Sequence, residues 1–457
     1  TSLALNQPAD ARAAIEPAVR DHPNDGRLQY WLGRALAAST DQRSLAQQAF
    51  RRAMELQPDN LDAYVALAEL LIQLQRNDAA EQVLNEARAR VPDDAAIHRA
   101  LAHGRLARGD LAGAENELQE ALRRDRDDIR THFALGDVYR RQGRLDDAER
   151  ALEQVARVDP AYPGLSMLRG QVAEAQGRLP QALATFREAL ARDSTNIDLI
   201  NRVAATLVLL GNYGDADQML RSAVVDHPTN AETQYLMGRA KLGAGNYQDS
   251  MHYLDRALEL NPQRADYMAY AAEAHQRLGD IARALQFAER SIELDPSFPR
   301  GYWVRASIRV HQGAAREALA DINRAVQYDR NFWEAYATWA EIDDALGQPD
   351  EAIRLYEMAT QHDNRHGDWF YNLGRLRADR GREDAARAAL NQARTLGAGL
   401  SPAPSWFVQG TRLLADLERA RNPTEARRLY LDYLRLVPPN SPGYNSVVAT
   451  LADLNGR

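Results

Sequence analysis

The 457-residue sequence contains no cysteine. This absence excludes disulfide bonds, thiolate zinc sites and cysteine nucleophiles. Lysine is almost missing as well, since Lys241 is the only one and arginine supplies the rest of the 56 basic residues. We interpret the arginine bias as the coding preference of a GC-rich bacterium, and the lack of cysteine as compatible with export from its cytoplasm.

Long apolar runs and an excess of positive charge are also absent. No stretch approaches the roughly 18 apolar residues that a membrane span requires, although the hydrophobic fraction of 45% is ample for a packed core. The net charge of -8 argues against sequence-independent binding to nucleic acid, which needs a basic surface to release counterions from phosphate. Because the chain begins without an initiator methionine or a signal-like run, we expect a segment before Thr1. For the compartment, we favour the periplasm over the cytoplasm.

Motifs for catalysis and cofactor binding are missing too. Lys241 does not follow a glycine-rich loop, and neither a GxSxG elbow nor an HExxH pair occurs. His362 and His366 have the four-residue spacing of metal ligands on a helix, but no third or fourth ligand accompanies them, and solvated loop histidines are the alternative. We therefore expect neither an enzyme nor a bound metal or cofactor, and we expect the function to lie in binding a partner.

What the sequence contains instead is a repeat of 34 residues, best seen in residues 231–264. In this stretch Gly238 is small enough for two helices to approach closely, Gly245 suits the left-handed residue after a helix, and Pro262 stops a second helix. The twentieth position of the repeat carries alanine, apart from Ser250. The eighth position always carries glycine or alanine: Gly33, Ala68, Ala102, Gly136, Gly170, Ala204, Gly238, Ala272, Ala306, Ala340, Gly374 and Gly410. Each repeat is therefore predicted to form two helices joined by a tight turn.

Small residues at two fixed positions, a turn glycine and a closing proline make nearly the whole chain resemble the tetratricopeptide repeat. The resemblance implies an all-α, right-handed superhelix of about twelve helix pairs. The repeats are expected to begin near residues 26, 61, 95, 129, 163, 197, 231, 265, 299, 333, 367 and 403. Residues 1–25 match part of a further repeat, residues 26–440 form the solenoid as one continuous domain, and residues 441–457 form a capping helix. A concentration of glycine and proline predicts a hinge at residues 395–405.

The resemblance also implies that the first helices line a concave groove, which positions two, five, nine and twelve of each repeat face. Acidic side chains predominate at these positions in the eighth to eleventh repeats, whereas basic side chains predominate in the first four. We expect a protein or peptide partner with cationic and apolar features at the acidic end, and we expect no nucleic acid and no membrane insertion. The candidate partner-binding residues are Asp266, Glu273, Arg300, Trp303, Glu334, Glu341, Asp344, Asp368, Tyr371 and Arg375.

Two large aromatic residues in this set have two interpretations. Position five of their repeats places Trp303 and Tyr371 toward the groove, where exposed aromatic side chains are typical anchors of interfaces. The alternative is that each ring packs locally onto the neighbouring helix. The sequence supports both interpretations equally.

These observations favour a non-catalytic scaffold or adaptor that holds a partner protein or peptide in its groove, within a bacterial envelope secretion or assembly complex. Periplasmic members of the family that serve exopolysaccharide export are similar in organisation. The alternative is a regulatory segment of a larger enzyme, such as a kinase or a glycosyltransferase, whose catalytic part precedes Thr1. The residues before Thr1 in the gene distinguish the two hypotheses, because the first predicts a signal peptide there and the second a catalytic domain.

Overall fold

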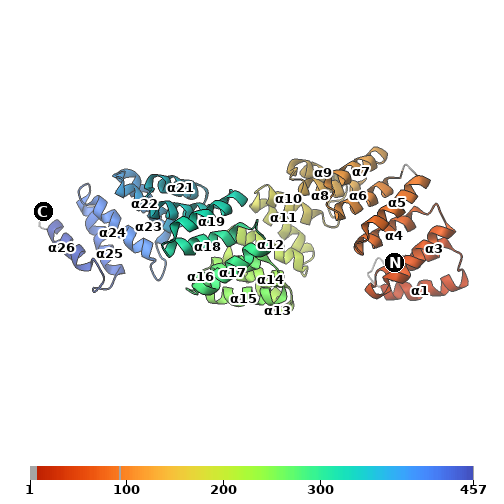
Figure 1. Cartoon of the computed structure of the whole chain (residues 1–457), viewed down its shortest axis with the longest axis horizontal. Helices are drawn as coiled ribbons and strands as arrows, with labels where there is room; N and C mark the ends of the chain where they lie inside the picture. Colours follow the sequence, from red (N-terminus) through yellow and green to blue (C-terminus); the bar gives the residue numbers. More distant parts are fainter. Residues whose placement is uncertain (1–7, 92–93, 456–457) are drawn as a thin grey trace. The chain divides into compact units, whose positions relative to one another are not determined.

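The part of the chain that the computed structural model describes, residues 8–91 and 94–455, is helical throughout and contains no strand (Figure 1). Twelve helix pairs follow one another, with one helix before them and one after. The all-α class, the twelve pairs, the partial first repeat and the final helix predicted from the sequence are thereby confirmed. Within these residues, no helix combines the length and the apolar character that a membrane span requires.

The first helices of the pairs are α2 (Gly26–Ala37), α4 (Leu61–Gln73), α6 (Ala95–Ala107), α8 (Ile129–Arg141), α10 (Leu165–Ala175), α12 (Ile197–Leu209), α14 (Ala231–Gly243), α16 (Ala265–Arg277), α18 (Pro299–His311), α20 (Trp333–Ala345), α22 (Gly367–Asp379) and α24 (Ser405–Glu418). The second helices are α3 (Arg43–Leu56), α5 (Asn77–Arg90), α7 (Leu111–Arg124), α9 (Leu145–Val158), α11 (Leu179–Arg192), α13 (Tyr213–Asp226), α15 (Tyr247–Leu260), α17 (Ile281–Leu294), α19 (Ala315–Tyr328), α21 (Pro349–His362), α23 (Glu383–Gly397) and α25 (Pro423–Leu436). Outside the pairs lie α1 (Pro8–Asp21), the short 3-10 helix η1 (Thr40–Gln42) between α2 and α3, and α26 (Tyr444–Asn455).

Ten of the twelve first helices begin at the residue that the repeat predicts. The exceptions, α10 and α24, each begin two residues late, at Leu165 and Ser405. The residue before each helix explains the shift, because Gly164 has the left-handed φ of +80° and Pro404 has extended backbone with ψ 149°. The repeat therefore predicts helix positions well, except where a glycine or proline with non-helical backbone precedes the first turn.

The turn between the two helices of a pair depends on a left-handed residue. Gly245 has φ +80°, and the backbone N–H of Asn246 returns to the carbonyl of Lys241 at 2.9 Å, which is the longer hydrogen bond of a Schellman cap. Glycine adopts this conformation without the clash that a Cβ would cause. In the second repeat Gln75 occupies the equivalent position with φ +58°, the one non-glycine residue with positive φ in the described part of the chain.

The small eighth position marks where the two helices of a pair touch. A Cβ built on Gly238 would lie 2.6 Å from Cγ of Leu254, the residue sixteen positions later on the second helix. Gly136 faces Leu152 in the same way, also at 2.6 Å. Ser250, the exception at the twentieth position, is fully buried, and its hydroxyl donates a 2.8 Å hydrogen bond to the carbonyl of Gly238. Ser250 thus connects the two helices of its pair at the same contact point.

The order of helix contacts places the first helices on the inner side of each curved stack. Within each unit, a second helix typically packs between the first helix of its own pair and the next first helix, as α17 does between α16 and α18. Several neighbouring first helices also contact one another, as α16 does with α18 and α18 with α20. No two second helices make a contact of comparable extent within the described residues. Equivalent helices of neighbouring repeats are closest together on the concave side of a curved stack. The first helices therefore line the groove.

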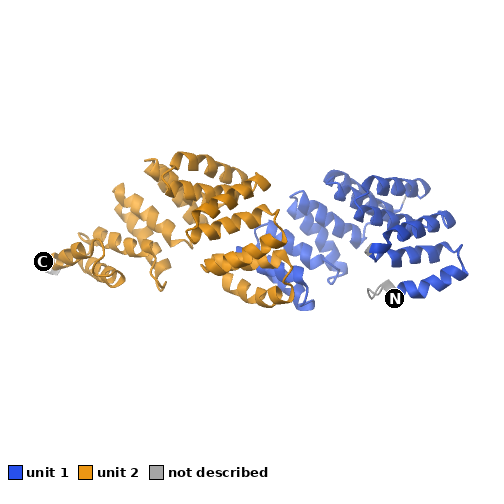
Figure 2. Cartoon of the chain, turned by 60° about the horizontal axis from the view of Figure 1, so that its bottom comes forward, with its two compact units in different colours: residues 1–210 blue, residues 211–457 orange. Residues whose placement is uncertain are grey.

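The chain divides into two compact units, residues 1–210 (unit 1) and residues 211–457 (unit 2) (Figure 2). The boundary falls in the loop between α12 and α13, inside the sixth repeat. The loop after α23, where we predict a hinge, lies within unit 2. At the end of unit 2, Val447 and Leu451 of α26 are buried against a cluster that includes Leu429 and Tyr433 of α25. This helix therefore covers the apolar face of the last pair, as terminal elements of repeat arrays must.

Candidate functional site

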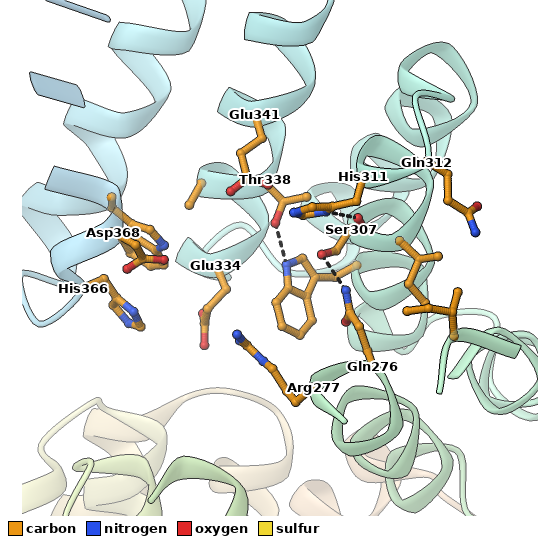
Figure 3. Close-up of a pocket in the computed structure, with 15 residues that line it drawn as sticks. Gln276, Arg277, Ser307, His311, Gln312, Glu334, Thr338, Glu341, His366 and Asp368 are labelled. Carbon is orange, nitrogen blue, oxygen red and sulfur yellow. Dashed lines mark hydrogen bonds between the residues drawn. The ribbon is translucent and has the colours of Figure 1, made fainter. Parts of the chain in front are cut away.

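A cavity of about 620 Å³ lies on the concave side of unit 2, between α16, α18, α20 and the start of α22 (Figure 3). Its apolar wall includes Trp303 and Ile308 of α18 and Trp369 of α22. Its polar wall includes Arg277 of α16 and Glu341 of α20. A cavity of this size, with an apolar wall and a few polar groups, is typical of a binding site.

A second cavity of about 340 Å³ adjoins the first one and shares His311 and Glu341 with it. It continues between α18, α20, α21 and α22, where Asp344, Asn372 and Arg375 line it. The two cavities together follow the inner face of four consecutive repeats, from the eighth to the eleventh. Four of the ten predicted partner-binding residues line the first cavity, namely Trp303, Glu334, Glu341 and Asp368. Of these four, Glu341 also lines the second cavity.

The carboxylates of the larger cavity are weakly paired or unpaired. Neither Glu341 nor Asp368 has a hydrogen bond or an ion pair within the described residues, and Glu334 is 3.9 Å from the guanidinium of Arg300. Burial raises the pKa of Glu341 to about 7, the carboxyls of Asp368 and Asp344 act in the same direction, and His311 and Arg277 act against it. The cavity therefore holds negative charge that the protein itself does not neutralise.

The other predicted acids of the groove are neutralised by arginines. The pairs, with their shortest nitrogen to oxygen distances, are Asp266 with Arg264 at 2.5 Å, Glu273 with Arg300 at 2.6 Å and Asp344 with Arg375 at 2.5 Å. The last two pairs join consecutive first helices. These residues hold neighbouring repeats together and keep little free charge for a partner.

Trp303 is packed locally and also lines the larger cavity. Its side chain is only 6% exposed, and its indole N–H donates a 2.9 Å hydrogen bond to the hydroxyl of Thr338, dashed in Figure 3. The ring of Phe332 meets it edge-on at 5.4 Å between ring centres. The structure thus places this indole as a fixed wall and not as a protruding anchor.

Tyr371, the second predicted aromatic, lies outside both cavities. It is half-buried and packs against the core cluster of the last repeat, which contains Val408 and Leu414 of α24. The structure therefore gives Tyr371 a place in the contact between the eleventh and twelfth repeats.

A row of arginines and aromatic rings extends from the cavity toward α14. The guanidinium carbon of Arg300 lies 4.3 Å from the ring centre of Tyr270 and 5.2 Å from that of Trp303. On α14, Arg239 approaches the same Tyr270 ring at 4.6 Å. Stacking of this kind stabilises a partly buried guanidinium. Neither Arg239 nor Tyr270 is among the residues predicted from the sequence.

The sequence analysis also missed the thirteenth position of the repeat. Arg277 and His311 both occupy it and both line the cavity, and Figure 3 shows Arg277 and Glu334 pointing toward one another. Position thirteen lies one helical turn after position nine, so it faces the same side of the helix. The helical period alone therefore predicts that position thirteen faces the groove. The sequence analysis considered only positions two, five, nine and twelve.

The two histidines with metal-ligand spacing stack on tryptophans. His362 lies 3.8 Å from Trp333, and His366 lies 3.8 Å from Trp369, with nearly parallel rings in both cases. His366 also contacts the carboxylate of Asp363 at 3.3 Å. In the described residues no group of three or more histidine, aspartate or glutamate side chains is arranged to hold a metal ion.

Unit 1 offers less at its basic end. Arg99 donates to the carboxylate of Asp128 at 2.5 Å, and Arg140 donates to that of Asp137 at 2.7 Å, so these two of the basic groove residues are neutralised internally. A depression of about 690 Å³ in unit 1 is formed by the α1–α2 loop and the end of α3, and Arg27 is its only predicted groove residue. The cavities of unit 2 are therefore the better candidate site.

Comparison with known proteins agrees with this architecture. One model of the tetratricopeptide repeat matches residues 2–43, 99–149, 133–197 and 235–299, and a second matches residues 40–104, 173–240 and 345–398. No curated protein sequence matches the chain. Among solved structures, the APC/C hetero-tetramer Cut9–Hcn1 is similar with a TM-score of 0.57 and 15% identity, covering 99% of this chain and 94% of that one. The human IFIT1 dimer with m7Gppp-AAAA is similar with a TM-score of 0.53 and 17% identity, covering 80% and 91%. At such identities the structural similarity establishes the fold alone.

Proposed function

Because the chain belongs to the tetratricopeptide repeat family, whose helix pairs build scaffolds for protein interaction, we propose that unit 2 binds an extended cationic segment of a partner protein. The segment lies along the inner face of α16, α18, α20 and α22. The observation that supports this proposal is the cavity of about 620 Å³ in which Glu341 and Asp368 have no partner among the described residues.

Charge and packing have separate roles in such an interaction. The unpaired carboxylates attract a basic segment and increase its rate of association, whereas the fixed apolar wall of Trp303 and Ile308 removes apolar surface of the segment from water and slows dissociation. Because the indole of Trp303 is already held by Thr338, this wall is ordered before the partner binds, and little side-chain entropy is lost on binding.

A peptide-display library selected on the whole protein tests the proposal. Enriched peptides are then titrated by calorimetry into the parent and two variants. In Ser307→Trp the new ring occupies the cavity, and in Gln286→Trp the same change lies on the exposed side of α17, outside both cavities. We expect Ser307→Trp to abolish binding and Gln286→Trp to bind like the parent, with equal helicity in all three. Binding that survives Ser307→Trp would place the interaction elsewhere on the protein.

We propose the bacterial envelope as the setting, with the scaffold in the periplasm as part of a secretion or assembly complex. The lack of cysteine and the arginine bias support this setting. The gene sequence before Thr1 tests it: a signal peptide agrees with the proposal, and export of the full-length protein to the periplasm would be measured by fractionation. A catalytic domain in that place would instead identify the chain as the regulatory segment of a kinase or glycosyltransferase.

A further inference from the structure

We propose that the larger cavity of unit 2 receives the charged end of one arginine or lysine side chain, held between the carboxylates of Glu341 and Asp368. This inference rests on the proposed function and names the chemical group that the groove recognises. Guanidinium and ammonium groups share the required chemistry, a positive charge with several N–H donors.

The first argument is the contrast between paired and unpaired acids on the same surface. Asp266, Glu273 and Asp344 each have an arginine within 2.6 Å, whereas Glu341 on α20 and Asp368 on α22 have no hydrogen bond or ion pair in the described residues. Both carboxylates are half-buried and line one cavity. Because a partly buried charge is costly without a partner, this unpaired couple indicates a place for an external cation.

The second argument is the shape of the cavity. Its volume of about 620 Å³ lies within the range of roughly 300–1,000 Å³ that is common for ligand pockets. Trp303, Ile308 and Ala337 supply an apolar wall along which the methylene stem of an arginine or lysine can lie while its charged end reaches the acids. Figure 3 shows Glu341 above Glu334 and Asp368 to the left of it.

Other occupants fit the same walls less well. An anion would face three carboxylates, since Glu334 also lines the cavity, against the single guanidinium of Arg277. A divalent metal ion would need a set of three or more close ligands, and the described residues contain no such group. An uncharged apolar side chain would leave both carboxylates desolvated without compensation.

A consequence follows for the pH dependence of binding. The groups that face Glu341 are Arg277 of α16, His311 of α18, Asp344 of its own helix, Tyr356 of α21 and Asp368 of α22. Without a partner the pKa of Glu341 is about 7, so its carboxyl is largely protonated at pH 6 and largely ionised at pH 8. Because a cation binds the ionised form, binding lowers this pKa and releases a proton. The dissociation constant should therefore be about tenfold lower at pH 8 than at pH 6.

Blocked amino acids are suitable probes, because they carry one side chain and no terminal charge. N-acetyl-arginine amide and N-acetyl-lysine amide are titrated into the ¹⁵N-labelled protein, with N-acetyl-citrulline amide as the uncharged analogue of arginine. The indole N–H signals of Trp303 and Trp369, assigned through their phenylalanine variants, report occupancy. We expect saturable shifts with arginine, lysine or both, and none with citrulline.

Variants then assign the charge. Glu341→Gln and Asp368→Asn should each raise the dissociation constant about tenfold at pH 8. Glu351→Gln, the same change at an exposed acid of α21 outside both cavities, should leave it unchanged. Glu341→Gln should also remove the difference between pH 6 and pH 8, whereas His311→Gln should keep it.

The proposal is overturned by equal binding of arginine and citrulline probes, by the absence of saturable shifts with both charged probes, or by Glu341→Gln and Asp368→Asn variants that bind like the parent. A pH dependence that persists in Glu341→Gln and disappears in His311→Gln would refute the role of Glu341 as the titrating group. These failures differ from failure of the proposed function: in that case library peptides would bind Ser307→Trp as well as the parent.

Discussion

The contact between the eighth position of a repeat and the residue sixteen places later can be tested by one mutation. Its effect on the free energy of unfolding should change sign when the contacting residue is also replaced. Gly170 of α10 faces Phe186 of α11, which is fully buried. Two other repeats of unit 1 pair alanine with leucine at the same two places: Ala68 with Leu84 and Ala102 with Leu118. The ring of Phe186 occupies the space that a Cβ at residue 170 would need.

The structure gives the size of the effect. A Cβ at residue 170 would lie 2.6 Å from Cδ1 and from Cζ of the Phe186 ring and nearer still to Cε1, against 3.4–4 Å for ordinary contact. The buried ring must then move by roughly 1 Å, and overpacking of this kind costs about 1–3 kcal/mol. Alanine gains about 1 kcal/mol over glycine inside a helix. Gly170→Ala should therefore destabilise the α10–α11 pair by about 1 kcal/mol.

In the background of Phe186→Leu the same change should become stabilising. The leucine alone leaves a small cavity and costs about 1–2 kcal/mol. Adding Gly170→Ala then recreates the alanine–leucine pairing of the second and third repeats, so the helix-propensity gain of about 1 kcal/mol should appear without the clash. The double mutant should be more stable than Phe186→Leu.

Hydrogen exchange measured by mass spectrometry on peptides from residues 165–192 is the suitable assay, because it reports local opening free energies in an array that does not unfold in two states. We expect a coupling free energy of about 1–2 kcal/mol between the two sites. Additive effects, with Gly170→Ala destabilising in both backgrounds, would show that the two residues do not meet as described.

Four further predictions follow from the same geometry. Gln75→Gly should stabilise the second repeat by about 0.5–1 kcal/mol, since glycine relieves the left-handed strain, and slower exchange in α4 and α5 would show it. Gly136→Leu should destabilise the α8–α9 pair by about 1–3 kcal/mol, while Arg141→Leu at a 46% exposed side chain should have little effect; equal losses of melting temperature would contradict the assigned faces. Deleting residues 403–457 should leave a folded array that self-associates in sedimentation experiments, because the apolar face of the eleventh repeat is uncovered, and complete unfolding would refute the nearest-neighbour description. Glu341→Gln should stabilise the protein by roughly 1–3 kcal/mol at pH 8 and very little at pH 4, because a carboxyl whose folded pKa is raised loses its favourable protonated form as the pH rises from about 4.5 through 7; an equal effect at both pH values would argue against the raised pKa.

The sequence by itself determined the fold class and the positions of the helices. These features depend on preferences within a few residues of each other: Gly245 adopts positive φ because it lacks a Cβ, and Gly238 and Ser250 are small where two helices meet. The same local signals recur every 34 residues, so each repeat supports the assignment of the others. Even the two late helix starts come directly after a glycine and a proline, Gly164 and Pro404.

The tertiary structure alone decided which groove residues remain free to bind. Glu273 is neutralised by Arg300, 27 residues later, and Asp344 by Arg375, 31 residues later, whereas Glu341 and Asp368 stay unpaired. Such pairings depend on the stacking of consecutive repeats and on side-chain conformation, which no local pattern encodes. The same reason applies to the raised pKa of Glu341, to the burial of Trp303 and to the cavity that both residues line. Each of these properties arises only when helices from separate repeats pack together.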